Sequence, residues 1–145
     1  MLHDQMTPKK MATIHAAAKP NHRIWNAHEF ASLLSSPGVV AEYHPNGFAL
    51  ARIIDTDAEL LLLVTEKIKQ NTGIATGCLL KMEKHLVKLG ARELTLEVSE
   101  SNGTAINLYK KLNYKKIFIR KSYSRDKNGN LENALLMQKE LITLY

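Results

Sequence analysis

A short glycine-containing loop between an apolar run and a helical pattern is the first stretch of this sequence that could bind a ligand. The run Leu60–Val64 leads into a polar connection and then into Gln70-Asn71-Thr72-Gly73-Ile74-Ala75, where the helical pattern begins. The first backbone N–H groups of a helix have no partner within it and lie at the positive end of its dipole. A strand that enters a helix through such a loop therefore offers a backbone anion site that suits a pyrophosphate, and Gly73 permits close approach. A plain connection is the alternative.

Charge is distributed unevenly along the chain, which carries a net charge of +6 over 145 residues. Between Ile24 and Glu66 the acidic residues outnumber the basic ones, and Arg52 is the single basic residue there. The C-terminal half is basic, with Lys81, Lys84, Lys88, Arg92, Lys110, Lys111, Lys115, Lys116, Arg120, Lys121, Arg125 and Lys127. This pattern fits either a solvated surface or a polyanionic ligand, such as a nucleotide cofactor or RNA.

Length and cysteine content indicate one intracellular domain. The chain, residues 1–145, is long enough for one core, and its single cysteine, Cys78, excludes an intramolecular disulfide. No apolar run reaches the length of a membrane span, and the N-terminus lacks an apolar signal core, so a cytoplasmic protein is expected. The histidines and Cys78 show no metal-ligand spacing, so no metal is expected. Cys78 falls on an apolar helix face and should belong to the core.

The elements around the loop predict an α+β fold with a mixed sheet. Two helices come first, one after the Thr7 cap and one over 27–34. Three strands, a helix, a strand, a helix and two strands follow, over Val39–Tyr43, Phe48–Ile54, Glu59–Thr65, Ile74–Leu89, Glu93–Val98, Thr104–Leu112, Tyr114–Tyr123 and Glu132–Leu141. The strands on either side of the Ile74–Leu89 helix should be parallel neighbours, with the ligand at their C-terminal ends.

Two motifs resemble a known family. The loop Gln70–Ala75 resembles the acetyl-CoA signature Q/R-x-x-G-x-G/A of the GNAT N-acetyltransferase superfamily. The residues from Leu94 to Tyr114 are similar to the L-x-L-E-V…S-N-x-x-A-I-x-L-Y-x-x-L-G-F block of its ribosomal-protein-alanine N-acetyltransferases. The resemblance implies one GNAT domain over 1–145, with a central mixed sheet flanked by about four helices. Asn113 stands where the family has glycine, and the short N-terminus predicts a missing or very brief first strand.

The resemblance gives catalytic roles to Glu97 and Tyr109. An α-amine has a pKa of about 8, so a carboxylate must remove its proton before it attacks at neutral pH. Glu97 is the expected general base, and a surface charge pair is the alternative. A phenol with a pKa of about 10 can protonate a departing thiolate. Tyr109 is the expected general acid, and core packing is the alternative.

Acetyl-CoA is the cofactor that the resemblance implies. The backbone of the preceding strand end should bind pantetheine and polarise the thioester carbonyl, and the side-chain amide of Asn102 should contact pantetheine unless it serves only as a helix cap. The expected cofactor-binding residues are Leu63, Val64, Thr65, Gln70, Asn71, Thr72, Gly73, Ile74, Ala75, Thr76 and Asn102.

The acceptor that the resemblance implies is the N-terminal α-amine, with alanine first, of a small-subunit ribosomal protein. Its basic tail could be attracted by an acidic cluster near the predicted hairpin turns, made of Glu42, Asp55, Asp57 and Glu59. A lysine side chain or a small amine is the alternative acceptor. A basic RNA- or ribosome-binding module with a vestigial cofactor site ranks last, because the aromatic content of 6% leaves few residues for base stacking. A monomer or weak dimer is expected, without direct nucleic-acid or membrane binding.

Overall fold

The computed structural model describes residues 6–18, 24–66, 70, 72–125 and 128–141, without the side chains of 123 and 124. The predicted order of elements is confirmed, and the predicted strand bounds differ from the observed ones by one or two residues. The elements are α1 (Pro8–Ala17), α2 (Ala27–Leu34), β1 (Val39–His44), β2 (Gly47–Ile54), β3 (Asp57–Thr65), α3 (Ile74–Lys88), β4 (Glu93–Ser99), α4 (Gly103–Lys111), β5 (Lys115–Arg125) and β6 (Leu131–Glu140).

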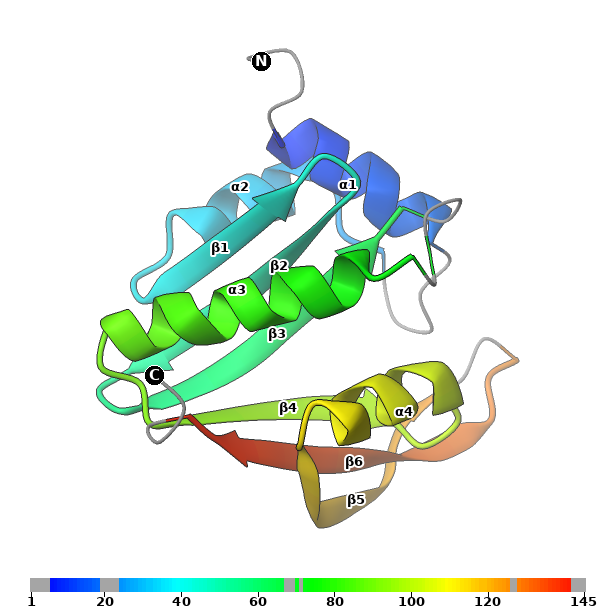
Figure 1. Cartoon of the computed structure of the whole chain (residues 1–145). Helices are drawn as coiled ribbons and strands as arrows, with labels where there is room; N and C mark the ends of the chain where they lie inside the picture. The colour runs from blue at the N-terminus through cyan, green and yellow to red at the C-terminus, as the bar shows by residue number, and fades with distance from the viewer. Residues whose placement is uncertain (1–5, 19–23, 67–69, 71, 126–127, 142–145) are drawn as a thin grey trace.

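The six strands form one mixed sheet in the order β1-β2-β3-β4-β6-β5. The predicted parallel pairing of β3 with β4 is confirmed, and the other neighbours are antiparallel. β6 is inserted between β4 and β5, so β5 forms the edge of the sheet. Helices α3 and α4 lie over the same face of the sheet, each above its own half (Figure 1).

Alternation along β2 and β3 divides the core between the two faces of the sheet. Phe48 and Leu50 pack with Met11, Ile14 and Phe30 of α1 and α2. The intervening small residues, Ala49 and Ala51, belong instead to a cluster that contains the apolar face of α3. Protein interiors are packed without large voids, so α3 lies close to the sheet where the side chains beneath it are small. The predicted core position of Cys78 is confirmed, since it is 3% exposed on this face of α3.

Local hydrogen bonds explain where the helices begin and end. The Thr7 hydroxyl accepts a hydrogen bond from the Lys10 N–H at 3.1 Å, and Asn26 forms a reciprocal capping box with Glu29. Asn113, where glycine is usual in the family, has φ of 75°, a conformation that asparagine tolerates. In the described residues, which start at 6, the chain enters α1 without a preceding strand. Within the described residues, no helix is both long and apolar enough to span a bilayer.

Candidate active site

The two central strands separate at the end where the ligand was expected. β3 pairs with β4 through three residue pairs, from Asp57 with Glu93 to Glu59 with Thr95, while its pairing with β2 continues to Thr65. Directly after the last pair, the register between β2 and β3 shifts, with Leu60 opposite Ala51 and Leu62 opposite Leu50. Leu61 is thus the extra residue of a bulge, which bends a strand. The bend carries β3 away from β4 and opens a V between them (Figure 1).

The open arm of the V exposes backbone groups of β3. Beyond Glu59, no described strand pairs with β3 on the side that faces β4. This arm contains Leu63, Val64 and Thr65, and the side chains of Val64 and Thr65 are buried. Backbone N–H groups left outside a ladder can donate to a ligand carbonyl, and a pantetheine chain presents such carbonyls. The predicted role of these residues requires this separation of the strands.

The loop before α3 has the local features of an anion site. Gly73 is the N-cap residue in a left-handed conformation, φ 87°, and supplies no side-chain cap, and the first turn contains no acidic residue. A Cβ added at Gly73 would meet no atom of the described residues within 4 Å, which leaves open space on this side of the loop. Gln70 Nε2 lies 3.5 Å from the Thr65 carbonyl oxygen and joins the loop to the open arm of β3. Asn71, also predicted to bind the cofactor, lies outside the described residues.

A hollow of about 260 Å³ borders the same loop. It lies between the end of β1 and the first two turns of α3, and it is lined by Thr72, Gly73 and Ile74 together with Lys81. Neither Glu97 nor Tyr109 lines it. The hollow therefore adjoins the expected pyrophosphate site but not the position of the reacting groups.

Glu97 lies on the solvent-facing side of β4. Its neighbours Leu96 and Val98 are 2% and 7% exposed and belong to the core under α3 and α4, so Glu97 points to the opposite face. Arg120 of β5 extends across β6, and its Nη1 lies 3.4 Å from Glu97 Oε1. The charge pair considered as the alternative for Glu97 is therefore present. The pair is partly exposed, so it contributes little stability and leaves the carboxylate reachable by solvent.

Tyr109 lies on the other side of β4, in the core under α4. It is 8% exposed, and burial raises its pKa to about 12. Core packing is therefore a property of this residue, and its phenol stays protonated through the neutral range. At the N-terminus of the same helix, Asn102 Oδ1 accepts a hydrogen bond from the Ala105 N–H at 3.2 Å. This bond confirms the capping role of Asn102.

Three of the four acidic residues near the first hairpins are not at the open end of the V. Asp57 and Glu59 lie where β3 and β4 still pair, which is the closed end, and Asp55 lies in the turn just before them. For these three residues the expected attraction of an acceptor tail is therefore wrong in its location, and Glu42 of β1 contacts His85 of α3. It failed because a residue's distance from a turn does not show at which end of the sheet that turn lies.

Other acidic side chains lie at the C-terminal end of β4, one in the turn that follows β4 and one in β6. Glu132 is 9% exposed and accepts hydrogen bonds from the hydroxyls of Ser99 and Ser101. Glu100 Oε2 accepts a hydrogen bond from Asn133 Nδ2 at 3.2 Å. These contacts and the Arg120 pair depend on the insertion of β6 beside β4, for which no local sequence pattern gives a signal. No cluster of metal-ligating side chains occurs among the described residues.

Three comparisons with known proteins agree with this geometry. Residues 6–114 match the model of the Acetyltransferase (GNAT) family. The chain is 28% identical over 130 residues to the [ribosomal protein bS18]-alanine N-acetyltransferase of Escherichia coli K12, which covers 87% of each chain. The crystal structure of the Escherichia coli ribosomal-protein-S18-alanine N-acetyltransferase superposes with a TM-score of 0.78 at 24% identity, covering 94% of this chain and 90% of that one.

A plant enzyme shares the fold at lower identity. Arabidopsis thaliana NAA60, crystallised with acetyl-CoA, superposes with a TM-score of 0.77 at 16% identity, covering 94% of this chain and 96% of that one. The family match spans the loop, the open arm of β3, β4 and α4, which are the elements that form the V. The chain belongs to the GNAT acetyltransferase family and is an acetyltransferase.

Proposed function

We propose that the protein transfers an acetyl group from acetyl-CoA to the N-terminal α-amine, with alanine first, of a small-subunit ribosomal protein. The observation that carries the proposal is the V between β3 and β4. Glu97 lies on one face of the sheet at β4, and Tyr109 lies on the opposite face. The acceptor is inferred from the activity of the Escherichia coli relative, ribosomal protein bS18-alanine N-acetylation.

Acetyl-CoA is the cofactor of the protein and supplies an activated acetyl thioester. The uncapped first turn of α3 fits its pyrophosphate, because the turn offers backbone N–H groups, open space and no acidic side chain. The residues that would hold it are Thr72, Gly73, Ile74, Ala75 and Thr76. Backbone N–H groups of Leu63, Val64 and Thr65 would hold pantetheine and polarise the thioester carbonyl, and Asn102 would contact the pantetheine chain.

The two side chains on β4 and α4 handle the protons. Glu97 is open to solvent and can accept the proton of the incoming ammonium, directly or through one water. The Tyr109 hydroxyl, which remains protonated because its pKa is about 12, donates its proton to the departing thiolate. Arg120 holds the carboxylate of Glu97 at the open end of the V and adds a positive charge that disfavours a cationic acceptor. An α-amine, about two pKa units below lysine, is neutral more often and suits this arrangement better.

Competition between two amines in one peptide tests the acceptor. Peptides that begin with Ala, Ser, Met or acetylated Ala, each with one internal Lys, would be incubated with the enzyme and acetyl-CoA. Mass spectrometry would locate the added acetyl group. We expect modification of the free Ala terminus and none of the peptide with a blocked terminus. Preferential modification of the internal Lys would favour the lysine or small-amine alternative.

A further inference from the structure

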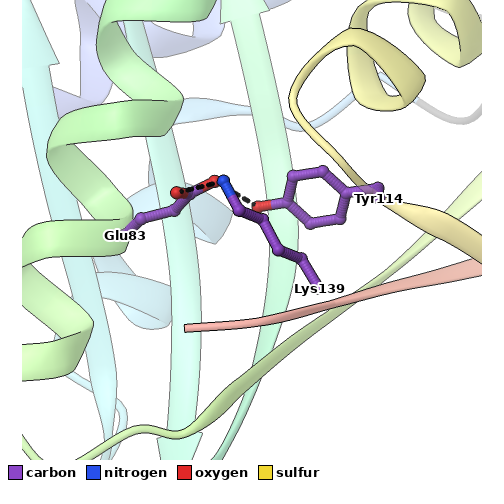
Figure 2. Close-up of polar contacts among 3 residues, drawn as sticks. All are labelled: Glu83, Tyr114 and Lys139. Carbon is purple, nitrogen blue, oxygen red and sulfur yellow. Dashed lines mark hydrogen bonds and ion pairs between the residues drawn. The ribbon is translucent and has the colours of Figure 1, made fainter. Parts of the chain in front are cut away.

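A buried charged cluster joins three elements below the V. Glu83 of α3 is 0% exposed, and Lys139 of β6 is 7% exposed. Lys139 Nζ donates a hydrogen bond to Glu83 Oε1 at 2.7 Å, and the Tyr114 hydroxyl donates one to Glu83 Oε2 at 2.8 Å. Figure 2 shows the three side chains converging from α3, from β6 and from the segment that follows α4. We call these three residues the Glu83 cluster.

The composition of this cluster needs an explanation beyond stability. Removing a carboxylate and an ammonium from water costs free energy that their attraction often fails to repay, and apolar residues of similar volume are often as good or better. Tyr114 adds a hydroxyl to this buried cluster, and the hydroxyl donates a hydrogen bond to Glu83 Oε2. A phenyl ring alone would fill nearly the same space, so the effect of the hydroxyl is to fix the ring in one orientation on α3.

The backbone turn that ends α4 also connects Tyr114 to Tyr109. Asn113 is in the left-handed conformation, its N–H donates to the Lys110 carbonyl at 3.0 Å, and the Tyr114 N–H donates to the Tyr109 carbonyl at 2.9 Å. This pattern is a Schellman motif, which commonly brings the side chains of the two outer residues into contact. Here the two rings lie edge to face, with centroids 5.8 Å apart.

We infer that the Glu83 cluster is a positioning device for Tyr109. Glu83 anchors the Tyr114 hydroxyl, Lys139 balances the charge of Glu83, and the Tyr114 ring supports the Tyr109 ring from its edge. The cluster thereby fixes the distance between α3 and α4, the two helices that border the V. That distance sets where the Tyr109 hydroxyl lies. This inference rests on the proposed general-acid role of Tyr109. Tyr114, Glu83 and Lys139 are positioning residues and not catalytic ones.

A double-mutant cycle between Tyr114 and Tyr109 tests the inference. Tyr114→Phe keeps the ring but removes its anchor, so we expect kcat to fall roughly tenfold, since small misplacement of a reacting group is costly. The dissociation constant of acetyl-CoA, measured by calorimetry, should change by less than about twofold, since Tyr114 lies outside the loop and β3. In a Tyr109→Phe background, Tyr114→Phe should cause no further loss, because its target is absent.

The outcomes separate two kinds of failure. If Tyr109→Phe alone leaves kcat unchanged, the general-acid role is wrong, and the positioning inference is wrong with it. If Tyr109→Phe lowers kcat, but Tyr114→Phe has no effect or the same effect in both backgrounds, the positioning inference alone is wrong.

His85→Ala is the matched control, because it breaks the 2.7 Å contact of α3 with Glu42 on β1, away from the two tyrosines. It should leave kcat within about twofold of the wild-type value.

A triple variant guards against loss of folding. The triple variant combines Glu83→Leu, Tyr114→Phe and Lys139→Met. It leaves no polar group of the cluster buried without its partner, so it should fold at least as well as any of the three single variants. We expect kcat to remain reduced roughly tenfold. In the absence of cofactor, a tyrosine titration should show the Tyr109 proton leaving at lower pH than in the wild type, because a less restrained ring is better solvated. Full kcat in the triple variant would show that the cluster serves only packing.

Discussion

The half of the sheet formed by β1, β2 and β3 and the half formed by β4, β6 and β5 offer different kinds of groups to a ligand. In the first half, the groups expected to hold the cofactor are backbone amides of β3 and of the first turn of α3, and the nearby side chains are mostly apolar or small. In the second half, the groups expected to act on the ligand are side chains, namely Glu97, Asn102, Tyr109 and Arg120. Substitutions in the first half should therefore change cofactor binding, and those of Glu97 and Tyr109 in the second half should change turnover.

Glu97→Gln should produce the largest effect and tests the second half. It keeps the shape of the side chain and removes the base, so kcat should fall roughly 10²-fold or more. The deficit should shrink as pH rises through about 8, where the α-amine loses its proton unaided. Steady-state rates between neutral and alkaline pH, at saturating acetyl-CoA, measure this. Glu93→Gln is the matched control at the closed end of the same strand, where Glu93 accepts a hydrogen bond from Gln138. Equal rates for wild type and Glu97→Gln would remove Glu97 from the mechanism.

The burial of Tyr109 should make the free energy of unfolding depend on pH in the alkaline range. Burial raises its pKa from 10.0 to about 12, so the unfolded chain loses this proton first as pH rises. The contribution is intact below about pH 10 and is lost as pH rises toward 12, by about 3 kcal/mol at most. Chemical denaturation of wild type and Tyr109→Phe at pH 9 and above would show a shallower pH dependence in the variant. The pH dependence of Tyr43→Phe, a variant in the first half, should differ less from that of wild type, since Tyr43 is 45% exposed. Equal pH dependence of wild type and Tyr109→Phe would contradict the burial argument.

Gly73→Asp tests the first half. The substitution puts a negative charge where the pyrophosphate is expected, so the dissociation constant of acetyl-CoA should rise at least roughly tenfold. The left-handed φ of 87° adds some strain, which Gly73→Asn shares, and asparagine tolerates this conformation. Calorimetry on Gly73→Asp and the isosteric Gly73→Asn separates charge from strain and bulk. An unchanged affinity in a folded Gly73→Asp would move the anion site elsewhere.

Asn26→Ala should produce the smallest effect and lies outside both sets of groups. It removes the side-chain acceptor of the Glu29 N–H at the start of α2, so the free energy of unfolding should fall by about 1 kcal/mol. Asn26→Ser keeps a capping oxygen and should lose less. Neither kcat nor acetyl-CoA affinity should change, and a changed kcat would mean that α1 and α2 shape the acceptor site. Thermal unfolding and steady-state kinetics measure both properties.

Local chemistry is the part of this protein that its sequence specifies. Alternation in Leu94-Thr95-Leu96-Glu97-Val98 predicts which side chain faces solvent, and the burial of Leu96 beside exposed Glu97 confirms it. Thr7 and Asn102 cap the helices they were expected to cap, because a cap depends on residues at most three positions away. The loop before α3 was identifiable for the same reason. Its glycine, its lack of a capping side chain at Gly73 and the anion site expected there are properties of a few consecutive residues.

The tertiary structure alone decided which distant groups meet. The insertion of β6 between β4 and β5 brings Arg120 to Glu97, and no periodicity in β5 predicts that contact. The bulge at Leu61 sets where β3 leaves β4, and it depends on the register with β2. Glu83 and Lys139 are 56 positions apart, and each alone has the residue type of a solvated surface charge. Their burial follows from the packing of α3 over the sheet, since contacts between distant residues exist only once the strand order is formed.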